Sequence, residues 1–195
     1  MRHLIAVLIS TTALIFTPLA VAGGDAANGK TVALEKGCAG CHGVDGNSPA
    51  PTWPNIAGQG EKYLVKQLRA FRDNNLEKSG RVDPTMAGFA AGLSDQEIDD
   101  LSAYFASQKA KSGESDKEFV ELGLQLYRGG DKTRGIPSCM GCHGPTGAGN
   151  PASGYPALSG QWASYTETQL NNFKLENRRN DQNRMMRDIA SKMYP

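Results

Sequence analysis

A cysteine motif that occurs twice constrains this chain more than any other feature of its sequence. Residues 38–42 read Cys-Ala-Gly-Cys-His, and residues 139–143, about one hundred positions later, read Cys-Met-Gly-Cys-His. Segment 54–59 (Pro-Asn-Ile-Ala-Gly-Gln) likewise recurs as 156–161 (Pro-Ala-Leu-Ser-Gly-Gln), at almost the same offset. A repeat that keeps its spacing indicates a duplicated structural unit. The chain is therefore expected to contain two copies of one domain.

Each copy has the pattern of a small helical domain with glycine- and proline-rich connections. Over residues 61–74, Tyr63 and Phe71 belong to one apolar helix face, and the same spacing recurs in the second copy. Ser94 and Glu97 have the spacing of a capping box, which marks the start of a further helix. No segment alternates polar and apolar residues long enough to suggest a strand. The expected fold class is all-α.

The domain boundaries follow from the repeat. We expect two copies of the same domain, at residues 23–110 and 111–195. Each copy is expected to begin with a short helix, near 28–36 in the first and near 118–128 in the second. The polar segment 107–117 is the expected linker, because it lacks large apolar residues. Domains of this size bury little apolar surface by themselves, so the composition leaves room for a large apolar cofactor in each.

The first 22 residues have the layout of a secretory signal peptide. A short positive start at 2–3 precedes an apolar run at 4–16 and a small-x-small site at 20–22. The alternative is a membrane anchor, but the run is shorter than the ~20 residues that span a bilayer. We therefore expect export to the periplasm after cleavage. With 21 basic and 20 acidic residues, the chain has no electrostatic footprint for nucleic acid.

The repeated motif is the attachment signature for a c-type haem. Two thiols one turn apart can add to the two vinyl groups of a haem, and the following histidine then lies beneath the iron as its proximal ligand. A disulfide or redox pair, or a zinc site built from both pairs, would leave the two histidines and the repeated flanks unexplained. Two covalently bound haems are therefore expected. Their attachment and proximal residues are Cys38, Cys41 and His42 in the first copy, and Cys139, Cys142 and His143 in the second.

The sixth iron ligand follows by elimination. The chain has no other histidine after the leader, and methionine is the usual alternative in cytochromes c. Met86 is the only methionine of the first copy outside the leader. In the second copy the repeat register selects Met186, with Met185 as the near alternative, while Met140 is on the proximal side. Filling of an apolar core is the competing role for any methionine.

Two prolines are candidates to orient the proximal histidines. Pro54 and Pro156 open the repeated strings, and their carbonyls could accept the second ring N–H of each histidine. A plain turn role fits the spacing about as well. Elsewhere, charged residues such as Asp100, Arg178 and Arg187 are expected to form ordinary solvated faces.

Over nearly all of the chain after the leader, the sequence resembles the dihaem cytochrome c4 family, tandem class I cytochromes c of bacterial periplasms. The most specific strings are 41–48 (Cys-His-Gly-Val-Asp-Gly-Asn-Ser), 57–64 (Ala-Gly-Gln-Gly-Glu-Lys-Tyr-Leu) and 126–130 (Leu-Tyr-Arg-Gly-Gly). The resemblance implies one low-spin haem with histidine and methionine ligands per domain, with the propionates of the two haems near each other. It also supports the two prolines as partners of the histidines. It further implies redox protein partners, with a quinol-oxidising complex or another donor and a terminal oxidase as acceptor, and leaves room for peripheral membrane association.

Filled axial positions imply outer-sphere electron transfer rather than catalysis, because the iron then has no open site for substrate. The alternative is an enzyme, such as a dihaem peroxidase or a sulfur-compound dehydrogenase, with a vacant or unusual sixth position. The chain departs from the family pattern in one respect. The repeat register sets Pro195 opposite Asp95, so the second domain is expected to lack the closing helix that crosses the first helix near Gly29, and near Gly123 in the second copy. A more exposed second haem with a weaker methionine bond would follow.

Overall fold

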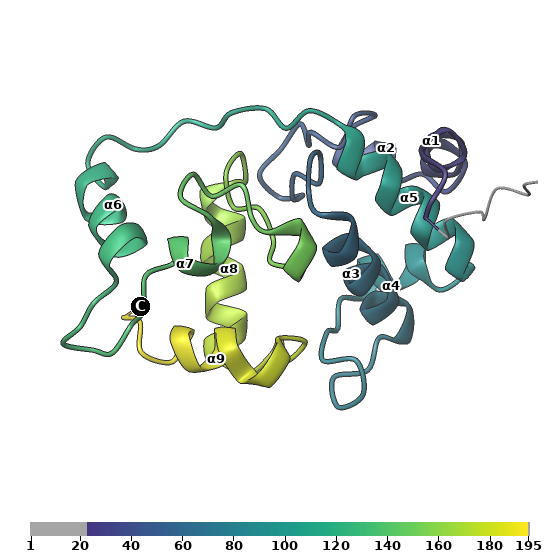
Figure 1. Ribbon diagram of the computed structural model, residues 1–195. Helices are drawn as coiled ribbons and strands as arrows, with labels where there is room; N and C mark the ends of the chain where they lie inside the picture. Colours follow the sequence, from purple (N-terminus) through teal and green to yellow (C-terminus); the bar gives the residue numbers. More distant parts are fainter. Residues whose placement is uncertain (1–22, 195) are drawn as a thin grey trace, which may run out of the picture.

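The computed structural model describes residues 23–194, which form two lobes side by side, joined by an extended segment (Figure 1). The first lobe holds five helices: α1 (Ala26–Glu35), α2 (Ala39–His42), α3 (Glu61–Asp73), α4 (Pro84–Ala90) and α5 (Asp95–Ser107). The second holds α6 (Val120–Gly129), α7 (Met140–His143), α8 (Ala163–Lys174) and α9 (Met185–Ala190), with 3-10 turns at Pro151–Ser153 and Gln182–Arg184. The expected leader at 1–22 lies outside the described residues.

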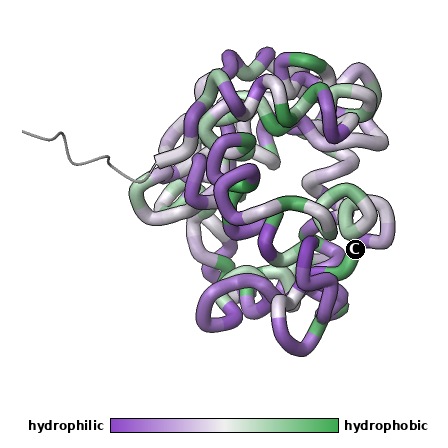
Figure 2. The backbone as a smooth tube through the Cα atoms, turned by 90° about the vertical axis from the view of Figure 1, so that its right-hand side faces the viewer, coloured by the Kyte–Doolittle hydropathy of each residue, from purple (hydrophilic) through white to green (hydrophobic). Residues whose placement is uncertain are grey.

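The architecture is helical in both lobes, as expected from the sequence. Within residues 23–194 the only β pairings are isolated bridges, one of which joins Arg81 to Arg178 across the two lobes. Hydrophobic and hydrophilic residues alternate along the helices rather than gathering in long runs (Figure 2), which is the pattern of amphipathic helices around small cores. In this part of the chain, no helix has the length and apolar character needed to cross a membrane.

The core of the first lobe forms where α1 crosses α5. Gly29 permits the crossing, because a Cβ at this position would come within 2.0 Å of the Asp100 carbonyl oxygen. Ile98 and Leu101 of α5 are fully buried beneath it. The capping box predicted at Ser94 and Glu97 is present, so the start of α5 is confirmed.

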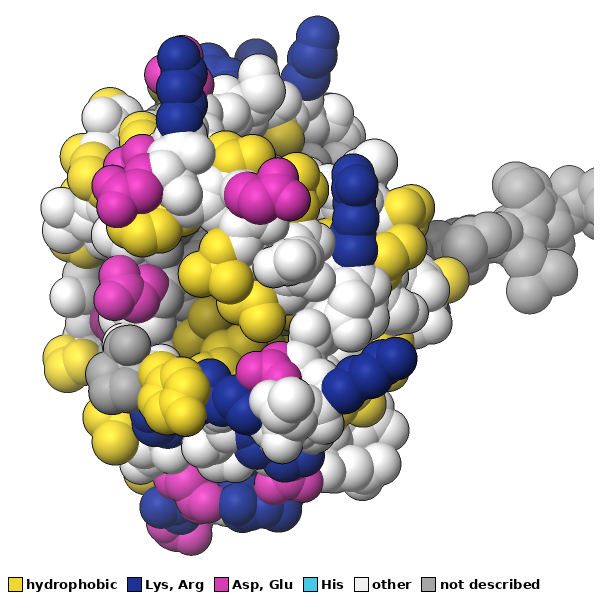
Figure 3. Space-filling model, turned by 90° about the vertical axis from the view of Figure 1, so that its left-hand side faces the viewer, with side chains coloured by type: hydrophobic (Ala, Val, Ile, Leu, Met, Phe, Trp, Pro, Cys, Tyr) yellow, Lys and Arg dark blue, Asp and Glu magenta, His cyan; other side chains and the backbone are white. Residues whose placement is uncertain are grey.

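The second lobe presents a different first helix. No residue of α6 is buried, and the leucines at 122, 124 and 126 remain exposed or nearly so. A Cβ on Gly123 would meet nothing within 4 Å. Figure 3, which faces this side of the molecule, shows hydrophobic side chains gathered around a hollow. Within the described residues, no helix takes the place that α5 has in the first lobe.

The expectation that the charged residues form solvated faces is wrong for Asp100 and Arg178, and Arg187 also departs from it, with a side chain that is 12% exposed. Asp100 is 1% exposed, and its carboxylate accepts hydrogen bonds from the Asp25 backbone N–H (2.7 Å) and the Asn28 side chain (2.6 Å). These contacts anchor the start of α1 on α5. Arg178 is 5% exposed and lies between the two lobes. Their burial depends on contacts far apart in the sequence, which no local pattern reveals.

Candidate functional site

The first cysteine motif folds into one helical turn, α2, which ends in a buried histidine. His42 is 7% exposed, and its Nδ1 lies 2.9 Å from the Pro54 carbonyl oxygen. Because a carbonyl can only accept, Nδ1 carries the ring proton and Nε2 keeps its lone pair. Burial lowers the pKa of His42, although the bond to Pro54 opposes this shift. The imidazole is therefore held neutral and oriented, as a metal ligand requires.

The second motif repeats this geometry. Helix α7 ends at His143, which is also 7% exposed, and its Nδ1 lies 2.9 Å from the Pro156 carbonyl oxygen. The prediction that the two prolines orient the histidines is confirmed for both copies. Among residues 23–194, neither ring has another hydrogen bond, so each Nε2 is available to an iron atom.

The four cysteines of the two motifs form no disulfide bonds, and each is half-buried. Burial raises the pKa of the Cys38 thiol and of the Cys139 thiol. A thiol on either side of one helical turn, followed directly by an imidazole, is the donor set that haem attachment needs. The residues therefore fit two haems.

The methionine of the first lobe lies at the start of a well-capped helix. Asp83 accepts a hydrogen bond from the Met86 backbone N–H (2.9 Å), and Pro84 takes the first turn of α4. The Met86 side chain packs against the buried core of the lobe. This position is compatible with an axial ligand and also with a core role.

In the second lobe, Met185 and Met186 are the first two residues of α9, and both are partly buried. No side chain caps this helix in the usual way. The segment before it instead contains three residues other than glycine with left-handed backbone, at Glu176, Asn183 and Arg184. Such residues are strained by about 1–3 kcal/mol each and persist only where the surroundings hold them.

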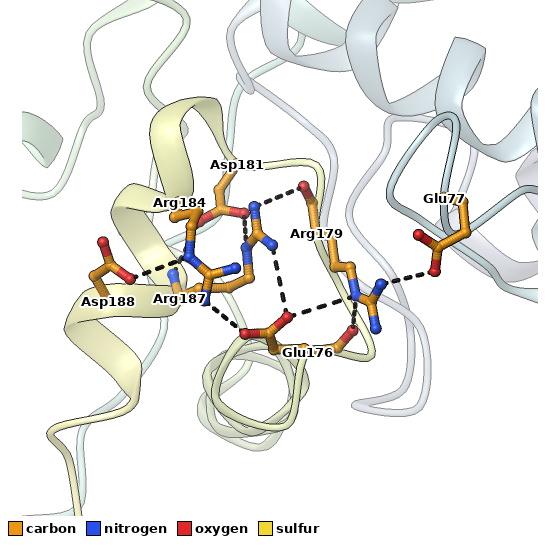
Figure 4. A network of polar contacts seen from close by, with 7 residues as sticks. All are labelled: Glu77, Glu176, Arg179, Asp181, Arg184, Arg187 and Asp188. Atoms are coloured by element: carbon orange, nitrogen blue, oxygen red, sulfur yellow. Dashed lines mark hydrogen bonds and ion pairs between the residues drawn. The ribbon is translucent and has the colours of Figure 1, made fainter.

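A network of charged side chains holds this segment (Figure 4). Asp181 accepts from the Arg187 backbone N–H (2.9 Å) and from its Nε (2.7 Å), so one carboxylate fixes the first turn of α9. Glu176 lies among Arg179, Arg184 and Arg187, and Arg179 reaches Glu77 of the first lobe at 2.7 Å. No sequence pattern indicated this network, since the spacing of Asp181 has no counterpart in the first copy.

Two buried arginines lie between the lobes with no carboxylate partner in the described part of the chain. Arg81 donates to Gln67 and, at 3.0 Å, to the Tyr165 hydroxyl. Arg178 donates to Gln67 (3.1 Å) and to the Tyr63 hydroxyl (3.0 Å). Burial alone raises the pKa of Tyr63, but the two arginines together lower it to about 8. Two buried cations without anions suit a site that receives the carboxylates of a bound group.

One further buried donor also supports the binding of a group with carboxylates. The indole N–H of Trp162 is buried and has no hydrogen-bond partner among the described residues. An unpaired buried donor is unfavourable unless a bound molecule completes it. Like the two arginines, it fits a cofactor with ionised carboxylates, and a haem has two propionates. The sequence could not reveal either feature, because a free donor is recognised only once its surroundings are known.

Comparison with known proteins agrees with this geometry. The family model described as Cytochrome c matches twice, at residues 26–109 and 120–194. The chain is 48% identical over 182 residues to cytochrome c4 of Azotobacter vinelandii, covering 91% of this chain and 86% of that protein. It is 46% identical over 183 residues to cytochrome c4 of Stutzerimonas stutzeri, with the same coverage of both. The crystal structure of reduced recombinant cytochrome c4 from Pseudomonas stutzeri superposes with a TM-score of 0.83 at 45% identity, covering 88% of this chain and 92% of that one.

Proposed function

Because this chain belongs to the cytochrome c4 family, and is therefore a dihaem electron-transfer protein, we propose that it shuttles electrons in the periplasm between the proteins of a respiratory chain. Its donor would be a quinol-oxidising complex or another reductant, and its acceptor a terminal oxidase. The observation that carries the proposal is the duplicated histidine site, in which each ring is buried and fixed by a proline carbonyl. A leader at residues 1–22 and a boundary near residue 110 are part of the proposal.

We assign the site residues by position in the two copies. Cys38 and Cys41 attach the first haem, with His42 and Met86 as its axial ligands. The corresponding residues for the second haem are Cys139, Cys142, His143 and Met186. Bound haem supplies a one-electron change at each iron between Fe(II) and Fe(III). With a thioether as the sixth ligand, the reduced form is favoured and the reduction potential is raised.

The polypeptide serves this reaction by holding its own groups still. Pro54 and Pro156 fix the planes of the two imidazoles, and burial excludes water from the ring faces. Asp83 and Asp181 hold the helices that carry the methionines. Ligands that keep their positions in both oxidation states need little rearrangement, and rapid outer-sphere transfer depends on this property.

A visible-spectrum potentiometric titration of the full-length protein, produced in a host that matures c-type cytochromes, tests the proposal. We expect two haems per chain, both low-spin, with the methionine–iron charge-transfer band present at both ferric irons. A high-spin ferric haem at rest would instead favour an enzyme, such as a dihaem peroxidase. Preparation of periplasmic and cytoplasmic fractions tests the compartment, and rapid oxidation of the reduced protein by oxidase-containing membranes tests the acceptor.

A further inference from the structure

Each proximal histidine is connected to the opposite lobe through a single peptide group. The Pro54 carbonyl accepts from His42 Nδ1 at 2.9 Å, while the N–H of the same peptide unit, on Asn55, donates to Gln161 Oε1 at 2.9 Å. In a trans peptide these two groups point in opposite directions. The peptide therefore lies between the imidazole of the first lobe and the side-chain amide of a glutamine from the second.

The second lobe has the corresponding arrangement, with the roles of the two lobes exchanged. The Pro156 carbonyl accepts from His143 Nδ1 at 2.9 Å, and the N–H of Ala157 donates to Gln59 Oε1 at 2.8 Å. Both glutamines are the last residues of the repeated strings 54–59 and 156–161, so duplication produced the exchange. The same contact occurs twice with the roles of the lobes reversed.

Each glutamine binds both backbone groups of the residue that follows the proline, so it makes two bonds rather than one. Gln161 also donates through Nε2 to the Asn55 carbonyl at 2.8 Å, and Gln59 donates to the Ala157 carbonyl at 3.1 Å. Gln59 is 7% exposed, so its bonds have little competition from water. A side-chain amide paired with both backbone groups of one residue fixes that residue in position and orientation.

We infer that Gln161 and Gln59 are positioning residues for the haem of the opposite lobe: Gln161 sets the hydrogen bond of His42, and Gln59 sets that of His143. Hydrogen bonds in a chain polarise one another, so an acceptor on the N–H makes the carbonyl of that peptide a stronger acceptor. A stronger bond from Nδ1–H raises the basicity of the imidazole toward iron. The glutamine therefore favours Fe(III) and lowers the reduction potential of the haem across the interface.

This inference rests on the proposed function, since it takes the two histidines as iron ligands. It assigns a role to residues that touch neither histidine. It also makes the potential of each haem depend on docking of the other lobe, because separation of the lobes removes both glutamines from their peptides.

The test replaces each glutamine in the full-length haem protein and follows the two haems separately by their NMR methyl resonances during a redox titration. For Gln161→Leu we expect the Fe(II)/Fe(III) ratio of the first haem at a fixed ambient potential to rise by about threefold to tenfold, tenfold being about 59 mV for one electron. The second haem should change by less than half as much. Gln59→Leu should give the reverse pattern. The Nδ1–H resonance of His42 in the reduced protein should move upfield in Gln161→Leu.

Lys62→Gln is the matched control, because it removes a hydrogen bond between the lobes, to the Ala152 carbonyl at 3.0 Å, without touching either peptide or the helices that carry the methionines. It should leave the difference between the two potentials unchanged. An equal shift at both haems in Gln161→Leu, or a larger shift at the second, would overturn the inference and leave only a structural role.

If that variant does not assemble, Gln161→Glu carries the test. Its carboxylate is a stronger acceptor, so the first haem's potential should fall and the His42 Nδ1–H resonance should move downfield. An unmoved resonance would overturn the inference, whereas wild-type protein without histidine-ligated haem would overturn the proposed function itself.

Discussion

The two lobes share a sequence pattern, but they bury the apolar residues of the first helix to different extents. In the first lobe, α1 packs against α5 and contributes Gly29, Val32 and Ala33 to a closed interior. In the second, α6 has a well-formed apolar face and buries none of it within residues 23–194. Phe119 and Leu122 are 60% and 56% exposed. Within residues 23–194, the haem motif and its proline partner have the same geometry in both lobes, because their contacts are local, whereas the first helix is buried only where α5 crosses it.

The methionine segments differ as well. Helix α4 begins with an aspartate cap and a proline, which fix it locally. Helix α9 depends on Asp181 and on arginines that reach as far as the other lobe. The second site is therefore supported by more distant contacts, and we expect it to respond more strongly to changes at the interface.

The largest difference should appear when a leucine is truncated in each lobe. Leu101→Ala opens a cavity under α1, where the side chain is 1% exposed, and should lower the stability of the first lobe by about 2–5 kcal/mol. Leu124→Ala, at a position 41% exposed, should change stability by no more than about 0.5 kcal/mol. Amide hydrogen exchange resolved by lobe measures both. Equal losses would mean that the face of α6 is covered in solution.

A smaller effect is expected where carboxylates hold the methionine helices. Asp181→Ala removes two charge-assisted bonds to Arg187 from a side chain that is 3% exposed, and should destabilise α9 by about 1.5–3 kcal/mol. Asp83→Ala removes one cap from α4, for a loss of about 0.5–2 kcal/mol. Exchange of the α9 and α4 amides measures each. The exposed Asp188 is the control, and a loss from Asp188→Ala as large as that from Asp181→Ala would contradict the assignment.

Replacing the glycine of α1 or of α6 by alanine should change stability in opposite directions. Gly29→Ala should destabilise the first lobe by about 1–3 kcal/mol, since the new Cβ would come within 2.0 Å of the Asp100 carbonyl oxygen. Gly123→Ala meets nothing within 4 Å and should stabilise α6 by about 0.5–1 kcal/mol, because alanine is the better helix former. Denaturant unfolding followed at each haem would measure the pair. A destabilising Gly123→Ala would reveal a partner against this helix.

The last effect concerns the interface at high pH, and it is absent at neutral pH. The pKa of Tyr63 is lowered from its ordinary value of 10 to about 8, because Arg178 and Arg81 outweigh the opposing effect of burial. The unfolded chain then binds the proton more tightly than the folded one, so stability should rise between about pH 8 and pH 10. It is lost again as the pH falls through about 8. Thermal unfolding across this range measures the rise, and Tyr63→Phe should abolish it.

The sequence alone determined the local features of this protein. Two C-x-x-C-H motifs identified the two histidines as haem ligands. The proline carbonyls were candidate partners from their distance along the chain, where a plain turn role fitted about as well, and the family resemblance supported them. Helix starts followed from caps, as at Ser94 and Glu97. Each of these depends on residues within about a dozen positions of one another, where the chain itself limits the geometry.

Only the tertiary structure decided how the two copies meet. The burial of Asp100 and Arg178, the support of α9 by Asp181 and the exchange of Gln59 and Gln161 between lobes were all absent from the sequence pattern. The repeat identified both glutamines as corresponding residues, but it did not indicate which groups they bind. A side chain's partner far along the chain depends on how whole helices pack, and the same repeated string can bond within its own lobe or across to the other.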